Sequence, residues 1–452
     1  MRLSGAVWQL MTTWHGRACA ALALLVILAV PALCQTLRIY HIDVEQGDAT
    51  LLVSPSGRAL LIDCGKNGHG ERVKAALDAA GVDTVHHFVC THYHEDHYGG
   101  IDELVEQENV TVVHAYDRGD KNADCLPSST LTSATFVSYE DAIGHRAAHL
   151  MRGETIPLDP DVSVTCLAHG GVVLGEEHQE TGENENDMSV ALLVQYGGFR
   201  YFNGGDIEAP TERKIEEHDL AVDVDVCKAN HHGSDTSSTV DFMNEMSPAV
   251  IIISNGNHGG HKHPREVVLA RYGSMSPEPI VVQTNKYLKD PPGGNVDDAF
   301  IADLETTGTD GTILVTVDLA AGDYEVSYRD TTIVVPLKNP RPVAADVVIA
   351  RLLPDPDDGP DRQNEAVELR NDGAAAVDMT GWALRDERGR VWTLTSMGTI
   401  EAGASATFVR NGMPMNLNNN GDHVWLVDAR NHTIDEYAYS WCSKGVWIVT
   451  DH

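Results

Sequence analysis

Short apolar runs alternate with segments of helical periodicity through the first half of the chain. The runs 37–44, 49–53 and 59–63 predict three neighbouring strands, because each is short, apolar and bounded by turn residues. Residues 71–80 carry apolar side chains at helical spacing, and 84–91 form the next strand-like run. This order predicts a layered α/β fold.

The alternation continues to residue 272. Strands are predicted at 163–168, 189–196, 199–202, 222–229 and 250–253, and helices at 209–218 and 264–272. Polar clusters follow the ends of several of these strands, which predicts a functional site along one edge of the sheet. Residues from about 279 to 335 hold only strand-like runs, so we expect a β-rich extension of the same domain there.

A proline-containing linker at 336–342 is followed by short strand-like runs separated by Gly, Asn and Asp. These runs lie at 347–352, 365–371, 382–386, 406–409, 423–427 and 433–439. Strands of this length and spacing are typical of a β-sandwich. The pattern therefore predicts an α/β domain at 36–335, the linker, and a β-sandwich at 343–440.

Residues 1–34 have the pattern of a signal peptide. Two arginines precede the apolar run 18–30, which is short for a membrane span of roughly 20 residues. Ala32 and Cys34 are small residues at the spacing of a cleavage site, which predicts cleavage before Gln35. An uncleaved anchor and a lipidated Cys34 are the alternatives. Each of them predicts a body that is secreted, periplasmic or at the cell surface.

Composition narrows the class of protein. A chain of 452 residues, 42% of them hydrophobic, should form two domains with real cores. The formal net charge of −35 repels nucleic acid in general. A polyanionic substrate would therefore need a local basic patch or capture by a metal ion.

Six cysteines lie beyond the predicted leader. An oxidising compartment permits disulfides, and Cys125 with Cys166 is the pairing we predict. Cys64, Cys90 and Cys227 lie in apolar strand-like runs, so we expect buried thiols there.

The densest chemistry lies at 91–97, where Thr-His-Tyr-His-Glu-Asp-His follows an apolar strand. Three imidazoles and a carboxylate are suited to Zn²⁺ or a similar divalent ion. His92 and His94 can face one point while Asp96 and His97 face a second, which divides the ligands between two ions. A histidine-rich surface loop is the alternative.

Four more polar residues stand beside predicted strands. Asp63 ends one strand and can orient ligand histidines, Asp187 precedes another, Asp206 follows two glycines and can bridge two metals, and His232 supplies a further imidazole. Taken singly, such residues more often cap or turn the chain. In this order after the histidine cluster, they favour a metallohydrolase.

Residues from 37 to about 272 resemble the metallo-β-lactamase superfamily, specifically the metallohydrolase domain of ComEC-type DNA-uptake proteins. The motifs that carry the resemblance are IDVEQGDA at 42–49, LIDCG at 61–65, THYHEDHYGG at 91–100, NDMS at 186–189, GGDIE at 204–208, HHGS at 231–234 and HP at 263–264. The resemblance implies an αββα sandwich with a two-metal site.

The resemblance also implies a role for each residue of the site. It assigns His92 and His94 to the first ion, Asp96, His97 and His232 to the second, and Asp206 to both. Many superfamily members add a histidine before the strand at 189; this chain has Asn186 and Asp187 there, and we predict Asp187 as the third ligand of the first ion. His232 is preferred to His231 because the family ligand directly precedes glycine. Asp96 or His231 would manage protons, and His231 would contact the leaving phosphate. So many oxygen ligands fit Mn²⁺ as well as Zn²⁺.

Two further histidines, His261 and His263, lie either at the rim of this site or simply on the surface.

Residues 343–439 resemble a lamin-tail domain, an immunoglobulin-like sandwich, through EAVELRN at 365–371, MTGWALRD at 379–386 and NGDHVWL at 420–426. Trp382 is expected in its core. The segment carries no catalytic cluster, so the resemblance implies docking to a surface, polymer or partner.

The expected function is a secreted metal-dependent phosphodiesterase or nuclease that acts on DNA through a metal-bound hydroxide. A basic stripe would favour DNA, and the candidates for it are Arg118, Lys121, Arg200, Lys228, Lys262 and Arg265. Two other interpretations remain open. The same metals could serve a small phosphoester, such as phosphorylcholine, or a lactone, and the chain could be an adhesion protein with a relic site.

Overall fold

The computed structural model describes residues 36–450 except 124, 177–183, 290–293, 306–310, 320, 340–346, 358, 374–375, 387 and 429–432. The predicted signal peptide at 1–34 lies outside the described residues, as do residues 340–342 of the predicted linker. Within the described part, no helix has both the length and the apolar character of a membrane span.

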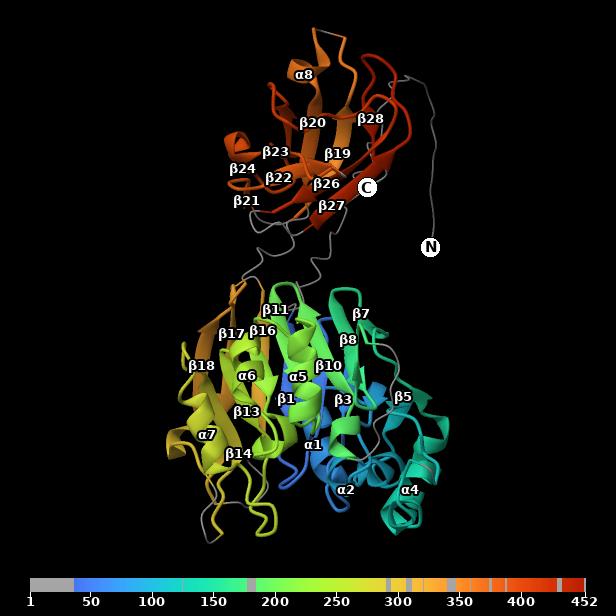
Figure 1. The fold of residues 1–452 in the computed structure, drawn as a ribbon, viewed down its shortest axis with the longest axis vertical. Helices are drawn as coiled ribbons and strands as arrows, with labels where there is room; N and C mark the ends of the chain where they lie inside the picture. The colour runs from blue at the N-terminus through green and yellow to red at the C-terminus, as the bar shows by residue number, and fades with distance from the viewer. Residues whose placement is uncertain are drawn as a thin grey trace, which may run out of the picture. The chain divides into compact units, whose positions relative to one another are not determined.

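The first sheet has nine strands and begins the α/β domain (Figure 1). Its spatial order is β18 (Thr331–Pro336), β17 (Asp323–Tyr328), β16 (Ile313–Asp318), β1 (Thr36–His41), β2 (Thr50–Val53), β3 (Ala59–Ile62), β4 (Thr84–Val89), β5 (Thr111–Asp117) and β6 (Ala148–His149). The pairs from β18 to β3 are antiparallel, and those from β3 to β6 are parallel. The predicted meander of three strands is confirmed.

The second sheet also has nine strands. Its spatial order is β15 (Ile301–Asp303), β14 (Ile280–Asn285), β13 (Val250–Ile253), β12 (Val226–Lys228), β11 (Phe199–Asn203), β10 (Ala191–Tyr196), β8 (Val162–His169) and β7 (Thr155–Asp159), and β9 (Val172–Val173) pairs with β8. Strands β11 to β15 are parallel. Their carboxyl ends therefore meet at one edge of the sheet, where ligands bind in open α/β folds.

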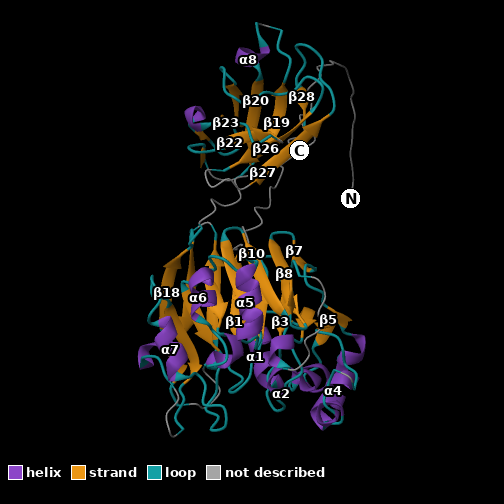
Figure 2. Ribbon diagram, viewed as in Figure 1, coloured by secondary structure: helices purple, strands orange, loops and turns teal. Residues whose placement is uncertain are grey.

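The two sheets pack face to face and carry helices on their outer faces (Figure 2). The first is covered by α1 (Gly70–Ala80), α2 (Glu95–Tyr98), α3 (Ser128–Leu131) and α4 (Ala134–Ala142), and the second by α5 (Ala209–Glu217), α6 (Val240–Met246) and α7 (Glu266–Tyr272). Strand β13 shows how the sequence builds both cores. Val250 and Ile252 join the core between the sheets, while Ile251 and Ile253 pack under the outer helices. The layering is αββα, as predicted.

The strands after residue 279 complete both sheets. Strands β14 and β15 extend the second sheet, while β16 pairs with β1 and continues the first through β17 and β18. The predicted β-rich extension is therefore integral to the sandwich. Its buried alternation, with Ile313, Val315 and Val317 in the core between the sheets, explains this placement.

The C-terminal part forms an all-β sandwich around its own core. One sheet has the order β25 (Ser405–Val409), β20 (Ala366–Asn371), β19 (Val347–Leu353) and β28 (Ile448–Val449), and the other β23 (Val391–Thr393), β22 (Ala383–Asp386), β26 (Asp422–Val427) and β27 (Thr433–Tyr439). A short pair, β21 (Val377–Asp378) with β24 (Thr399–Ile400), and the helix α8 (Asp361–Asn364) complete it. Trp382 and Trp392 are buried in the core, which confirms the prediction for Trp382.

Cys166 is a free thiol, so the predicted pairing of Cys125 with Cys166 is wrong. Cys166 is instead buried on β8 in the core between the sheets, where its sulfur packs as a small apolar group. The buried placement of Cys64, Cys90 and Cys227 is as predicted.

Candidate metal centre

The chain delivers the histidine cluster where β4 ends. His92 and His94 lie in the turn after the strand, and Asp96 and His97 lie in α2, which begins at Glu95 (Figure 1). Strand β4 lies between β3 and β5 in parallel pairing, so its carboxyl end points to the same edge as theirs. Asp63 follows β3 directly and so reaches the same edge.

Residues from the second sheet meet this turn. Asp206 follows β11, and the backbone at Gly205 has a φ of +57° and passes so close to Thr91 that a Cβ there would lie 2.9 Å from the threonine Cβ. Only glycine fits such a close, left-handed position without strain. His232 follows β12 in a turn where its own φ is +55°, a conformation that non-glycine residues rarely adopt. Such local strain is typical of a functional site.

The ligand atoms converge as three overlapping groups that share His97. Asp48 and Asp63 complete one of them, and the other two contain the predicted ligands. Of these two, one is His92, His97 and Asp206, the other is Asp96, His97 and His232, and within each group the ligand atoms lie within 4.8 Å of one another. Asp206 Oδ2 lies 3.2 Å from His97 Nε2 and 3.2 Å from His232 Nε2. His94 Nδ1 lies 3.0 Å from His92 Nε2 and so extends the first group. This arrangement can hold more than one cation.

Asp63 holds the cluster from behind. Its Oδ2 lies 2.7 Å from His97 Nδ1 and accepts a hydrogen bond from the Thr91 hydroxyl at 2.7 Å, while its Oδ1 accepts one from the Thr91 backbone N–H at 2.8 Å. A carboxylate on Nδ1 sets the tautomer and orientation of a ligating imidazole. Asp63 therefore aims His97 Nε2 toward Asp206.

His232 gives the most direct indication that the residues fit a metal ion. Its Nδ1 donates to the Ser254 carbonyl at 2.9 Å, which leaves the lone pair on Nε2. That nitrogen is buried and has no hydrogen-bond partner in the part of the chain that the structure describes, and it faces Asp206 at 3.2 Å and Asp96 at 3.6 Å. A buried lone pair beside two carboxylates is unfavourable unless a cation lies between them. The donor set of imidazoles and carboxylates suits Zn²⁺ or Mn²⁺.

Burial and neighbouring charges set the protonation of the site. Burial, with His97 and His94 nearby, lowers the pKa of His92 well below its usual value, so this ligand is neutral. Burial opposes ionisation of Asp206, but His232, His97 and Lys228 hold its pKa well below the usual range. Asp206 is therefore an ionised carboxylate, as metal binding requires.

Asp187, the predicted third ligand of the first ion, points elsewhere. Its Oδ1 accepts the backbone N–H of Glu208 at 2.8 Å, at the start of α5. Among the described residues it belongs to none of the groups of converging ligand atoms. Its neighbour Asn186 donates from Nδ2 to Glu208 Oε1 at 3.1 Å and lies 3.5 Å from His231 Nε2, and its buried Oδ1 has no hydrogen-bond partner among the described residues.

His231 lies beside the cluster and is held by residues that the sequence did not single out. Its Nδ1 lies 3.1 Å from the Thr236 hydroxyl and 3.2 Å from Glu208 Oε1. Burial alone would lower its pKa, but Asp206 and Glu208 raise it above the usual value. A protonated His231 can donate a proton to a leaving oxygen.

Two of the six basic-stripe candidates are buried in ion pairs. Lys228 is 1% exposed and lies between Asp48 and Asp206. Arg118 is 1% exposed and makes a bidentate contact to Glu185 at 2.8 and 2.7 Å. Neither cation can reach a phosphate backbone, so the stripe does not form as the sequence suggested.

The histidines at the rim differ in depth. His263 is buried, its ring 6.2 Å from that of His232 and 5.4 Å from that of His231, while His261 is exposed. Burial, with His232 and His231 nearby, lowers the pKa of His263 to about 2. His258, which the sequence analysis did not single out, lies 4.8 Å from His261 between ring centres.

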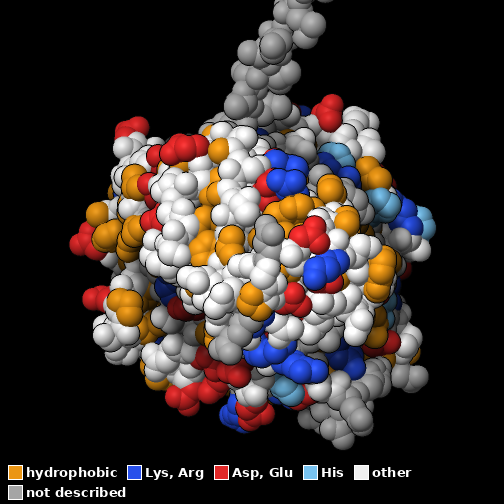
Figure 3. Space-filling view, turned by 90° about the horizontal axis from the view of Figure 1, so that it is seen from above, with side chains coloured by type: hydrophobic (Ala, Val, Ile, Leu, Met, Phe, Trp, Pro, Cys, Tyr) orange, Lys and Arg blue, Asp and Glu red, His pale blue; other side chains and the backbone are white. Residues whose placement is uncertain are grey.

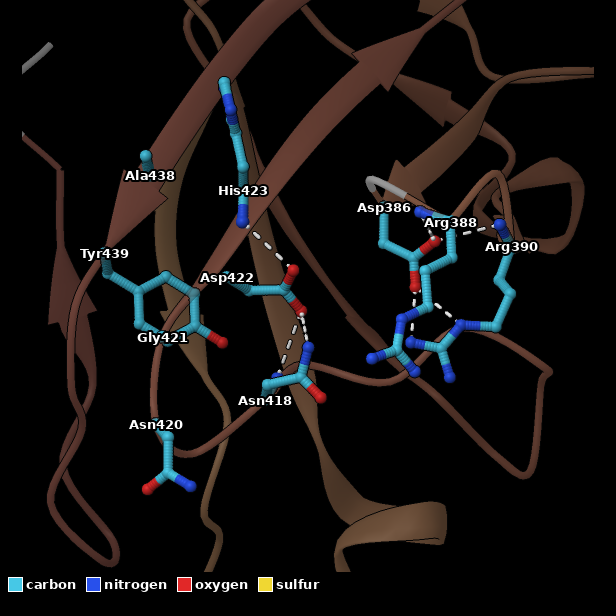
Figure 4. Close-up of a pocket in the computed structure, with 10 residues that line it drawn as sticks. All are labelled: Asp386, Arg388, Arg390, Asn418, Asn420, Gly421, Asp422, His423, Ala438 and Tyr439. Carbon is cyan, nitrogen blue, oxygen red and sulfur yellow. Dashed lines mark hydrogen bonds and ion pairs between the residues drawn. The ribbon is translucent and has the colours of Figure 1, made fainter.

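A polar pocket of about 590 Å³ lies on the C-terminal sandwich (Figure 4). Arg388 and Arg390 line one side and Tyr439 the other, with Asn418 between them. The backbone N–H and the side-chain amide of Asn418 donate to Asp422 Oδ2 at 3.1 and 2.8 Å. The face in Figure 3 shows acidic and basic side chains interspersed rather than a field of one sign. Metal-binding groups like those of the α/β domain do not occur among the described residues of this part.

Two family models match the chain. Residues 42–181 match the metallo-β-lactamase superfamily, and residues 340–440 match the lamin tail domain. Both resemblances drawn from the sequence are therefore confirmed.

Curated relatives agree with the ComEC-type resemblance. ComE operon protein 3 of Bacillus subtilis (strain 168) is 26% identical over 58% of this chain and 33% of its own length. Competence protein ComA of Neisseria gonorrhoeae is 24% identical over 51% of this chain and 28% of its own length. The chain thus spans about a third of the length of the curated relatives it matches.

Solved structures are similar only at a low level. Zn²⁺-bound PqqB from Methylobacterium extorquens has a TM-score of 0.32 and 16% identity over 56% of this chain and 87% of that chain. A diphosphatase of the PhnP family has a TM-score of 0.32 and 12% identity over 55% of this chain and 95% of that chain. The fold assignment therefore relies on the sheet order and the family match.

Proposed function

We propose that this chain, whose first domain is a metallo-β-lactamase superfamily hydrolase, is a phosphodiesterase that cleaves DNA outside the cytoplasm. The observation that carries the proposal is the convergence of imidazoles and carboxylates at one sheet edge, with a buried His232 nitrogen facing two carboxylates. Competence proteins among the relatives favour DNA as the substrate. Zn²⁺ or Mn²⁺ ions held by these residues would make water acidic enough to act as a nucleophile near neutral pH and would stabilise charge on the phosphate.

The proposed ligands follow the two groups that contain the predicted ligands. His92 and His94 would hold the first ion, Asp96, His97 and His232 would hold the second, and Asp206 would contribute to both. Asp187 remains the proposed third ligand of the first ion, although its carboxylate now anchors Glu208. The partnerless Asn186 Oδ1 is the competing candidate, and comparison of Asp187→Ala with Asn186→Ala in metal titrations separates the two.

Two residues are proposed to handle protons. Asp96 accepts a proton from the attacking water, because its side chain remains partly exposed beside His232. His231, held by Thr236 and Glu208, donates a proton to the leaving oxygen. The role of His231 requires a fixed ring orientation, which Thr236 and Glu208 already provide.

A small phosphoester is the second candidate substrate. The observation that favours it is the burial of Arg118 and Lys228 in ion pairs, which withdraws two cations from the surface of a chain with a net charge of −35. DNA binding depends strongly on cations that neutralise phosphates. A small ester needs only the metals and one or two polar contacts.

For the lamin tail domain we propose docking to a polymer or a surface. The polar pocket, with the Arg388 guanidinium and the Asn418 amide on its walls, offers groups that bind hydroxyl-rich or anionic chains. Binding of the separate domain to such polymers, compared with its Arg388→Ala variant, tests this role.

The deciding experiment offers purified protein with Zn²⁺ or Mn²⁺ both linear DNA and bis-p-nitrophenyl phosphate, with a chelator control. Cleavage of both substrates supports the DNA phosphodiesterase. Cleavage of the ester alone supports the second candidate. Inertness toward both in the presence of bound metal rejects the phosphodiesterase proposal.

A further inference from the structure

A buried ammonium group lies directly behind the metal centre. Lys228 is the last residue of β12, its side chain is 0% exposed, and its Nζ donates to the Gly205 carbonyl at 2.7 Å. Two carboxylates flank it, with Asp48 Oδ2 at 3.4 Å and Asp206 Oδ1 at 3.5 Å. A lone buried cation would be strongly unfavourable, so these carboxylates are its obligatory partners.

The two oxygens of Asp206 face opposite ways. Oδ1 faces Lys228, while Oδ2 lies 3.2 Å from the Nε2 atoms of both His97 and His232. The backbone N–H of Asp206 donates to the Ser189 hydroxyl at 3.1 Å, which fixes the other end of the residue. The carboxylate can therefore rotate little.

We propose that Lys228, anchored by Asp48, is a positioning residue that holds Asp206 in the orientation needed to bridge two metal ions. The inference rests on the proposed metal centre and deepens it. Lys228 binds Oδ1 and the preceding carbonyl, so Oδ2 is left to face the imidazoles. Without the ammonium, either oxygen of Asp206 could turn away from the site.

Lys228 is the ammonium that pairs with Asp48, whose carboxylate also lies within 4.8 Å of a ligand atom of His97. The neighbouring His41 is buried with both ring nitrogens lacking a hydrogen-bond partner, and burial lowers its pKa to about 4 despite the nearby Asp48. His41 is therefore neutral at pH 7, and Lys228 carries the charge that compensates Asp48. Asp48 in turn keeps Lys228 from being drawn fully toward Asp206.

The alternative is that the Asp48–Lys228 pair only stabilises the fold. A cycle of Lys228→Met, Asp48→Asn and the double variant separates the two roles. Removing one partner of a buried pair destabilises a protein, whereas removing both is often neutral. Each protein is unfolded with denaturant in the presence of a chelator, and Zn²⁺ binding is measured by calorimetry.

We expect Lys228→Met to lower both the unfolding midpoint and the Zn²⁺ affinity. The loss of affinity should be 10–100-fold, the usual effect of removing a residue that orients a ligand. In the double variant the unfolding midpoint should return toward that of the wild type while the affinity stays about 10–100-fold low. If Lys228→Met does not fold, the double variant alone decides.

Recovery of affinity together with stability in the double variant would overturn the proposal, as would wild-type affinity in Lys228→Met. Arg410→Met is the matched control, since it breaks the buried pair of Arg410 with Glu365, 3.0 Å apart in the C-terminal sandwich. It should lower stability and leave Zn²⁺ affinity unchanged. Zn²⁺ binding without DNA or ester cleavage would reject the phosphodiesterase proposal and leave the role of Lys228 intact.

Discussion

The α/β domain and the C-terminal sandwich place their charged side chains differently. At the metal centre, Lys228, Asp48 and Asp206 have side chains that are at most 3% exposed and that face a common point. Around the pocket of the C-terminal sandwich, the Arg390 side chain that binds Asp386 remains 32% exposed. Charges that are buried together are held in one arrangement, whereas half-exposed charges keep water as an alternative partner. The first arrangement suits chemistry and the second suits reversible docking.

The strongest way to break this comparison is His97→Ala, because His97 belongs to all three converging groups. Residues that merely orient a ligand account for 10–100-fold in affinity, so loss of a shared ligand should exceed about 100-fold. Metal content by atomic absorption and ester hydrolysis measure the effect. His114→Ala, which removes an exposed histidine on β5, serves as the control and should change neither. Retained activity in His97→Ala would show that the site is assigned wrongly.

His231→Gln should separate proton transfer from metal binding. We expect kcat to fall about 100-fold, the lower end for loss of a general acid, with Zn²⁺ affinity nearly unchanged. The comparison is sharpest with an ester whose leaving group needs no proton, since bis-p-nitrophenyl phosphate should be affected less than DNA. An equal loss on both substrates would contradict the proton-donor role.

Asp63→Asn tests how much the buried carboxylate that orients His97 contributes to metal affinity, compared with His97 itself. The amide keeps the shape but weakens the hold on His97 Nδ1, so Zn²⁺ affinity should fall about 10-fold. Calorimetric titration measures the change. Asp159→Asn, at a carboxylate that bonds the Ser56 backbone N–H far from the metal groups, is the control. Unchanged affinity in Asp63→Asn would remove its orienting role.

Arg410→Met tests the ion pair of Arg410 with Glu365, which is buried although the other charges discussed in the C-terminal sandwich are partly exposed. Loss of the guanidinium leaves the buried Glu365 carboxylate without its cation, so the free energy of unfolding should fall by about 3 kcal/mol. Arg370→Met, which breaks the exposed contact with Asp372, should give no measurable change in denaturant unfolding. Equal effects of the two variants would contradict the distinction between buried and exposed pairs.

The same sandwich should also show a pH dependence of its stability. Burial, opposed by the Leu417 backbone N–H and Arg410, raises the pKa of Glu365 from 4.5 to about 7. The folded state therefore binds this proton more tightly than the unfolded state, so stability is greatest below pH 4.5 and is lost as pH rises to 7. Denaturant unfolding between these pH values measures the slope. Glu365→Gln should flatten it, and an unchanged slope would assign it to another group.

The sequence predicted those features that depend on strand order and on polar residues at strand ends. The αββα layering, the β-sandwich and the turn that carries His92 to His97 follow from periodicity and from the motifs. The direction of a single side chain does not follow from such patterns. Asp187 and Asn186 are adjacent in one turn and both contact Glu208, but only Asn186 also lies beside His231, and only the fold decides this.

Burial of charge was the other feature beyond prediction. Lys228 ends an apolar strand and resembles a surface cation in sequence, yet Asp48, about 180 residues earlier, pairs with it across the two sheets. No local pattern links two such residues. The ion pair of Arg118 with Glu185 could not be predicted for the same reason, since it depends on how distant loops pack.

Strand β16 has a consequence for how the catalytic unit can be excised. Because β16 pairs with β1, the first strand of the domain finds its second neighbour, beside β2, only after residue 313 has been synthesised. A fragment ended at 181 or near 272 would leave β1 with an open apolar flank and would tend to aggregate. Expression of the enzyme alone should therefore extend to Pro336, the end of β18.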